Sequence, residues 1–485
     1  MKKTLVVIGG LVVVGAAACT SVAWYTGQQL PEQLGAALAD ANQQLDRAMG
    51  ARMQGKVELL SLDSHLFNSV ARYRVTFSNS DGESGSLDFV DHIEHGPFPW
   101  SRLKQFQLAP VMAASTYALE KTDKTAKWFD ASGDQLPLSG SASLGYGGSL
   151  RVDLKLAPLA VKGEDGTDFS FSGLTLQVDG DKGGNAMRLS AVMADMGVVG
   201  GKGSAEQLSL KGLTFAGDMT KTPHGFYVGS YAVDLAEASF AMTGQPAVKF
   251  GLDMRDTYRI ESTGLALKGI YNVSDINVAG KPLGSARIGW SMQQLDPEAI
   301  GKLSSWYEQH GSELEAIALQ QADGSRLLND PVLKDVLLRV LAGKPRVALD
   351  ELSFKTASGE SRFDLGIELA GVSLGDIPPA QALAQSVKSV QANLKISKPM
   401  IGEFAALRAS QDGLDADSIR QASATGEMVG MMALQTQMAT VKGDDILVRL
   451  GYADGLVEFN GQKMTLEQFQ TFVQGRAGLL AGVAQ

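Results

Sequence analysis

The chain is poor in cysteine and in charge of either sign. Cys19 is the single cysteine among 485 residues, which excludes an intrachain disulfide and a cysteine-rich zinc site. Asp and Glu number 53 against 43 Lys and Arg, and the formal charge of -10 leaves no global basic field to hold nucleic acid. Charged residues make up 20% of the chain and hydrophobic residues 44%, so wholesale disorder is excluded and a large core is expected.

Motifs that would fix a reaction are also missing. The sequence has no G-x-S-x-G elbow and no H-E-x-x-H helix. Gly201-Lys202 resembles part of a phosphate loop, but Gly203 stands where such a loop requires Ser or Thr. We therefore predict no cofactor, no metal site and no enzymatic activity from motifs.

The first 25 residues predict the location of the protein. Lys2 and Lys3 precede residues 5–25, which carry no charge and would span roughly 31 Å as a helix, about the thickness of a hydrocarbon core. The positive-inside rule makes residues 1–4 a cytoplasmic stub and places the other ~460 residues across the membrane. The sequence thus predicts a single-pass signal anchor in the inner membrane, with the bulk of the chain in the periplasm.

Two other interpretations of this segment stay open. Ala16-Ala17-Ala18 before Cys19 suits a lipoprotein cleavage site, although a larger aliphatic residue is usual where Ala16 stands. Simple signal cleavage is the other alternative. All three interpretations export the chain, and the length of the apolar run favours an uncleaved anchor over lipidation of Cys19.

Hydrophobic periodicity predicts a β-rich α+β protein, in which an N-terminal transmembrane helix precedes large antiparallel meander sheets with interspersed helices. Residues 28–50 have helical spacing and predict a juxtamembrane helix. Residues 56–295 alternate with period two and predict a β-rich periplasmic region. A helical segment is expected over residues 296–345, and a mixed α/β region over residues 346–485.

Local signals place several elements within these regions. Asp296-Pro297 and Asp330-Pro331 each offer a capping carboxylate followed by a first-turn proline, so a helix should begin at each. Further helical pieces are expected around residues 379–390 and 400–432. Asp454-Gly455 between alternating apolar residues predicts a tight hairpin.

The run His95-Gly96-Pro97-Phe98-Pro99-Trp100 combines two prolines with two large aromatic residues. The prolines restrict the backbone and favour an extended, ordered loop. We favour a rigid corner whose Phe98 and Trp100 plug the local core; the alternative is an exposed docking loop. His92 and Glu94 share one face of a strand while His95 faces the other, so convergence of all three on a metal ion is not predicted.

Four segments together resemble the YdgA/YihF-like family of Gram-negative envelope proteins, a group of unknown molecular function. These segments are Ala23-Trp24-Tyr25-Thr26-Gly27, His95-Gly96-Pro97-Phe98-Pro99, the continuation from Leu103-Lys104 to Pro110, and Asn460-Gly461-Gln462-Lys463-Met464. Their order runs nearly end to end, so the resemblance covers most of the chain. It implies an inner-membrane anchor with a periplasmic body, and it supplies no catalytic residues.

Two hypotheses of function follow. In the first, the protein is a non-enzymatic binding or scaffold module, held in the membrane by its N-terminal helix, whose apolar sheet face holds lipid or an envelope protein partner; a homo-oligomer is compatible with it. In the second, it is an envelope hydrolase with a site assembled from distant residues, with His92, Glu94 and His95 as first candidates. A long apolar groove would favour binding, whereas a deep pocket with convergent polar groups would favour hydrolysis.

Overall fold

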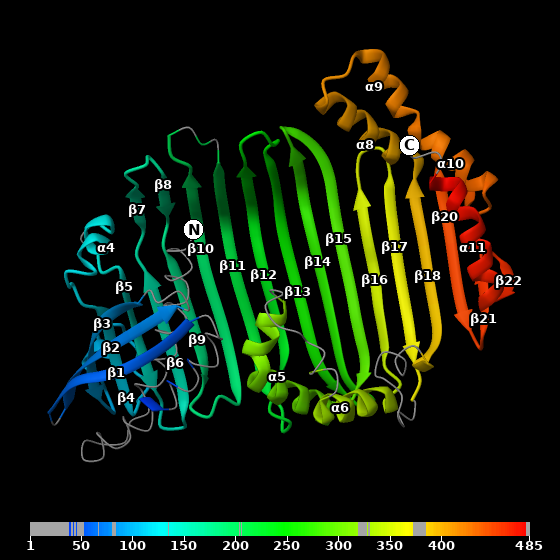
Figure 1. Ribbon diagram of the computed structural model, residues 1–485. Helices are drawn as coiled ribbons and strands as arrows, with labels where there is room; N and C mark the ends of the chain where they lie inside the picture. The colour runs from blue at the N-terminus through cyan, green and yellow to red at the C-terminus, as the bar shows by residue number, and fades with distance from the viewer. Residues whose placement is uncertain are drawn as a thin grey trace. The chain divides into compact units, whose positions relative to one another are not determined.

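The computed structural model describes residues 38–39, 42, 45, 53–65, 67–79, 84–133, 135–202, 204, 206–318, 327, 330–371 and 385–481. Within these ranges the chain is a β-rich α+β protein built on long antiparallel meanders with interspersed helices, as expected (Figure 1). It divides into two compact units, Met1–Gln245 with Ser304–Leu327 and Pro246–Leu303 with Leu328–Gln485. The predicted anchor and Cys19 lie outside the described residues. Of the helices that are described, none is long and apolar enough to cross a membrane.

The first unit is an antiparallel meander, and its described helices include the short α3 (Trp100–Leu103) and α4 (Ala126–Ala131). Its strands are β1 (Met53–Ser64), β2 (Asn68–Asn79), β3 (Ser84–His95), β4 (Ala113–Leu119), β5 (Leu138–Leu144), β6 (Ser149–Leu156), β7 (Leu159–Lys162), β8 (Asp168–Phe171), β9 (Leu174–Asp181), β10 (Ala186–Val199), β11 (Gln207–Lys221) and β12 (Tyr227–Ala241). Each strand pairs with the next from β1 to β6 and from β9 to β12, and β6 pairs with β9. The β7–β8 hairpin extends along β10 beyond the end of β9.

A closed hydrophobic core fills the part of this unit built from β1 to β6. Alternate residues of each strand point inward, so that Ile93 on β3, Leu138 on β5 and Val152 on β6 are only 1 to 2% exposed. Leu45, which lies in a helical stretch before β1, is 1% exposed in the same core. The amide of Asn42 exchanges two hydrogen bonds with the backbone of Val57, at 2.7 and 3.0 Å, and so ties that stretch to the edge strand β1.

The second unit continues the antiparallel theme with ten strands in the described ranges. They are β13 (Val248–Glu261), β14 (Gly264–Val278), β15 (Lys281–Leu295), β16 (Arg346–Lys355), β17 (Glu360–Leu369), β18 (Val387–Ser397), β19 (Thr440–Lys442), β20 (Asp445–Ala453), β21 (Leu456–Phe459) and β22 (Gln462–Thr465). Consecutive strands pair from β13 to β18; β18 then pairs with β20, whose other edge holds β19 and β21, and β22 pairs with β21. The helices are α5 (Pro297–Ala318), which begins in this unit, α6 (Pro331–Ala342), α8 (Lys398–Gln411), α9 (Ala416–Ser423), α10 (Thr425–Gln435) and α11 (Leu466–Ala481).

The local signals at helix starts and turns are confirmed, and one helix prediction is wrong. The amide of Ala299 donates to Asp296 at 2.7 Å, and the amide of Val332 donates to the Asp330 side chain at 2.7 Å. Asp454 and Gly455 have φ of 51° and 80°, the two positive values that a tight hairpin requires. Residues 379–384 of the helix expected over residues 379–390 lie outside the described residues, and its last four residues are not helical. They open strand β18, because pairing with β17 and β20 on both edges outweighs the local helical pattern.

Candidate functional site

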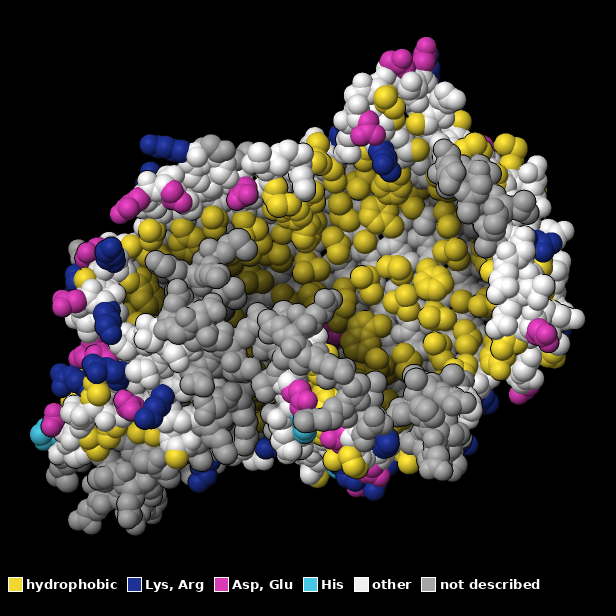
Figure 2. Space-filling model, viewed as in Figure 1, with side chains coloured by type: hydrophobic (Ala, Val, Ile, Leu, Met, Phe, Trp, Pro, Cys, Tyr) yellow, Lys and Arg dark blue, Asp and Glu magenta, His cyan; other side chains and the backbone are white. Residues whose placement is uncertain are grey.

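The strands of the second unit carry a continuous apolar face. Their registers align apolar side chains of neighbouring strands into rows, because alternate residues of a strand point to the same side. Three rows of five cross β15, β16, β17, β18 and β20: Ile288, Leu352, Phe363, Leu394 and Val448; Trp290, Leu349, Leu365, Ala392 and Leu450; and Met292, Val347, Ile367, Val390 and Tyr452. We call these fifteen residues the apolar face. Figure 2 shows hydrophobic side chains spread over these strands.

The side chains of the apolar face are more exposed to solvent than those in the core of the first unit. None of its fifteen residues is buried, and Leu352 is 43% exposed. Leu154 and Phe89 in the closed core are 3% and 4% exposed. The opposite side of the same strands is polar and carries the ion pairs Arg287–Glu351 and Lys395–Glu360, both at 3.3 Å. A contiguous exposed apolar surface in a folded protein usually marks a binding site.

A buried carboxylate lies on the same side of the sheet, at the end of one row. Asp256 on β13 is 1% exposed and stands opposite Gly269 on β14, which in turn stands opposite Trp290 on β15. The hydroxyl of Tyr271 donates to Asp256 at 3.0 Å, and the indole N–H of Trp290 donates to that hydroxyl at 2.9 Å. Burial, with Asp256 beside it, raises the pKa of Tyr271. Gly269 makes room for this cluster, because a Cβ there would lie 2.1 Å from the indole nitrogen.

Removing the central hydroxyl of this cluster should destabilise the second unit. In Tyr271→Phe, Asp256 loses a donor and the Trp290 N–H loses its acceptor, so we expect a loss of about 1 to 3 kcal/mol in the free energy of unfolding. Denaturant titration of the purified chain measures it. Tyr452→Phe on β20 is the matched control, because within the described residues the Tyr452 hydroxyl makes no hydrogen bond. Equal losses in the two variants would contradict a structural role for the cluster.

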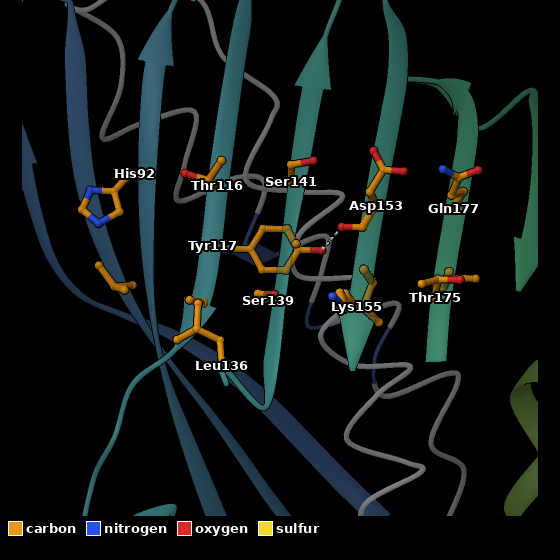
Figure 3. Close-up of a pocket in the computed structure, with 15 residues that line it drawn as sticks. His92, Thr116, Tyr117, Leu136, Ser139, Ser141, Asp153, Lys155, Thr175 and Gln177 are labelled. Carbon is orange, nitrogen blue, oxygen red and sulfur yellow. Dashed lines mark hydrogen bonds between the residues drawn. The ribbon is translucent and has the colours of Figure 1, made fainter. Parts of the chain in front are cut away.

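The first unit carries a depression of about 580 Å³ on the outer side of β3, β4, β5, β6 and β9 (Figure 3). One row across these strands consists of His92, Thr116, Ser141, Asp153 and Gln177. Tyr117 crosses over Gly140 and donates its hydroxyl to the backbone oxygen of Asp153 at 3.0 Å. The backbone of the sheet therefore forms the bottom of the depression, and side chains from neighbouring strands line it side by side.

The geometry of this row does not assemble a hydrolytic site. Neighbouring strands lie about 4.8 Å apart, so His92 on β3 and Ser141 on β5 are about 10 Å apart with Thr116 between them. A nucleophile and its base require hydrogen-bond contact. Over the described part of the chain, no group of three His, Cys, Asp or Glu residues could hold a metal ion.

The three residues proposed as first hydrolase candidates lie on one strand, β3, but they do not act on a common point. His92 is exposed on the outer side of β3, whereas Glu94 accepts hydrogen bonds from the backbone N–H of Ser101, at 2.9 Å, and from its hydroxyl. The Nε2 atom of His95 lies 3.1 Å from the hydroxyl of Ser69, and partial burial lowers the pKa of His95. Each residue is therefore engaged with a different neighbour or with solvent.

The run His95-Gly96-Pro97-Phe98-Pro99-Trp100 forms the start of the loop between β3 and β4. The backbone N–H of Gly96 donates to Met112 at 2.8 Å, and that of Val111 donates to Pro97 at 3.0 Å, so both ends of the loop are pinned together. Phe98 is 56% and Trp100 63% exposed, while Pro99 between them is buried. The expectation that the two aromatic rings plug the core is wrong, because the backbone turns Pro99 inward and both rings outward.

Several residues of interest escaped the analysis of the sequence. Phe106, Leu108 and Phe67 are 89%, 65% and 74% exposed and join Phe98 and Trp100 at one end of the first unit. Asp256 carried a usable signal, because it interrupts the apolar alternation of β13.

Comparison with known proteins gives the family of this β-rich chain. The family model described as "Bacterial protein of unknown function (DUF945)" matches residues 1–467, so the chain belongs to the DUF945 family. Among curated proteins it is 28% identical to Protein YdgA of Escherichia coli (strain K12), over 97% of this chain and 96% of that protein. It is 23% identical to the uncharacterized protein YihF of the same organism, over 92% and 94% of the two chains. The resemblance seen in the sequence is thereby confirmed.

A shorter relative and the solved structures complete the comparison. An uncharacterized protein of Haemophilus influenzae is 24% identical over 62% of this chain and 85% of its own length. No solved structure gives a significant match. The names of these three relatives state no activity.

Proposed function

We propose that this protein is a membrane-anchored periplasmic protein of the envelope that binds lipid acyl chains on the apolar face, without catalysing a reaction. The observation that carries the proposal is the open apolar face, where three aligned rows of apolar side chains are accessible to solvent across five strands. Acyl chains are flexible and apolar, and they need no specific polar partners along their length. A smooth surface of this kind suits them better than it suits a polar substrate.

The expected position of the protein supports lipid as the ligand. Residues 5–25 are predicted to anchor the chain beside a bilayer, which is the nearest source of acyl chains. The formal charge of -10 argues against nucleic acid in this role. Lipidation at Cys19, if it replaces the transmembrane anchor, would leave the body of the protein at a membrane surface all the same.

Photo-crosslinking at paired positions tests the proposal. A photoreactive phenylalanine analogue is placed at Ile367 on the apolar face, and in a second variant at Glu368, the next residue of β17, which points to the opposite side. After irradiation of cells, mass spectrometry of the full chain should find lipid adducts at position 367 and none at position 368. Both variants share one strand, one anchor and one expression route, so general membrane proximity cannot produce the difference.

Three other outcomes would overturn lipid binding. Adducts of position 367 with another envelope protein would assign the apolar face to a protein partner, and adducts with a second copy of this chain would assign it to a homo-oligomer. Equal lipid adducts at both positions would mean that the face has no preference for lipid.

A further inference from the structure

One end of the first unit projects a group of exposed apolar side chains that the apolar face does not include. Its six members, which we call the aromatic tip, are Phe67, Phe98, Trp100, Phe106, Leu108 and Tyr146, each 56 to 89% exposed. They lie in three connections: the one before β2, the one between β3 and β4, and the one between β5 and β6. The backbone N–H of His95 donates to Phe67, and that of Met112 donates to Leu144, so the three connections adjoin.

Hydrogen bonds hold the longest of these connections in one conformation. Gly96 and Val111 pin its two ends, and Ser101 fixes the start of α3 to Glu94. The Arg102 side chain donates to Ser143 at 3.2 Å, and the backbone N–H of Gln107 donates back to Arg102 at 3.0 Å. The exposed rings are thus presented by a fixed backbone.

The backbone of Phe106, in the longest of these connections, has a conformation that is unfavourable for phenylalanine. Its φ is +58°, a left-handed conformation that bulky L-residues rarely adopt and that glycine adopts freely. The ring is 89% exposed, so packing within the described protein gives little in return. Strained backbone that is retained without a packing benefit is a sign of function.

The charged side chains of the connection between β3 and β4 are all positive. Residues 95–119 contain no Asp or Glu, although the whole chain has an acidic excess, and Arg102 and Lys104 lie among the exposed rings. The ammonium group of Lys104 lies 5.6 Å from the centre of the Trp100 ring. Exposed Trp and Phe beside Lys and Arg match the headgroup region of a bilayer, where aromatic rings sit at the interface and cations meet anionic lipids.

We propose that the aromatic tip inserts into the headgroup region of a bilayer that contains anionic lipids. The first unit thereby gains a second attachment to the membrane besides the N-terminal anchor. A protein partner is disfavoured because the side chains are 56 to 89% exposed on three connections, whereas protein hot spots cluster in desolvated pockets. This inference is independent of lipid binding on the apolar face, since the two surfaces share no residue.

A depth measurement on the full chain tests it. Cys19→Ser removes the native thiol, and Gln105→Cys carries an environment-sensitive fluorophore beside Phe106 while all six side chains of the aromatic tip remain. In vesicles with about 30 mol% phosphatidylglycerol we expect a blue-shifted emission and quenching by lipids spin-labelled near the headgroup. In purely zwitterionic vesicles, quenching of the fluorophore by the spin-labelled lipids should be at least about twofold weaker.

Substitutions separate insertion from folding. Phe106→Gly should lower lipid quenching at least about threefold, yet leave the melting temperature unchanged or raise it, because glycine suits the left-handed backbone. Tyr307→Ala on α5, where the ring is 61% exposed, is the control for loss of an exposed aromatic and should not change quenching. A fluorophore that stays open to aqueous iodide in anionic vesicles would overturn the proposal. Protection that needs an added envelope protein would overturn it as well.

Discussion

Replacing Leu394 by glutamate is expected to reduce lipid capture by the apolar face more than about tenfold while the protein stays folded. Leu394 lies on β18, in the row of the apolar face between Phe363 and Val448. An acyl chain laid over this position would have to cover a carboxylate, and stripping water from an unpaired charge costs several kcal/mol. A loss of that size exceeds the ~1.4 kcal/mol that corresponds to each factor of ten in binding.

The cost to folding should be much smaller, because the Leu394 side chain is already partly exposed. A glutamate there can keep its carboxylate in water when no ligand is bound, so we expect a loss of about 1 kcal/mol in stability. The measurement is the yield of lipid adducts from a photoreactive residue at Ile367, together with the melting temperature.

The neighbouring residue supplies the control. Asn393→Glu adds the same charge one position earlier in β18, on the polar side, where Asn393 donates to Asp364 at 2.8 Å. Lipid adducts at Ile367 should persist in this variant. If both variants lose lipid equally, the effect is one of net charge and the apolar face is not the binding surface.

The elements of this fold that local chemistry determines could be predicted from the sequence. Alternating apolar residues mark the long strands. The carboxylates of Asp296 and Asp330 mark helix starts, because each carboxylate accepts a hydrogen bond from a backbone N–H only two or three residues away. Thr465 and Gln468 exchange two hydrogen bonds at the start of α11 for the same reason.

The candidate sites depend on pairings that the sequence does not encode locally. Trp290 stands opposite Leu349, with α5 and α6 between them in the chain, so the row that joins them follows from strand register. The direction of Phe98 likewise depends on hydrogen bonds between residues 96–97 and 111–112, whose partners are 16 and 14 residues apart in the chain. A Pro-Phe-Pro-Trp run predicts an ordered loop, but it does not predict which of its residues faces the core.

Substitution by alanine should destabilise the protein much more at Gly96 than at Phe98, two residues further along that loop. A Cβ on Gly96 would lie 1.8 Å from the backbone oxygen of Val111 and 2.8 Å from that of Met112. Neither oxygen can move away unless the backbone at Met112 moves too. That backbone accepts the hydrogen bond from the Gly96 N–H and donates one to Leu144. We expect Gly96→Ala to cost about 2 to 4 kcal/mol, through the loss of one or two backbone hydrogen bonds in a partly buried setting.

Phe98→Ala should lower the free energy of unfolding by at most about 1 kcal/mol, because more than half of the side chain is already exposed. Thermal unfolding of the two purified variants beside the parent makes the comparison. A shift of about 2 to 4 °C per kcal/mol predicts a clear drop for Gly96→Ala and almost none for Phe98→Ala. A large drop in Phe98→Ala would mean that the ring is packed after all and would remove it from the aromatic tip. An unchanged melting temperature in Gly96→Ala would mean that the loop is free to rearrange, and the fixed presentation of the tip would fail with it.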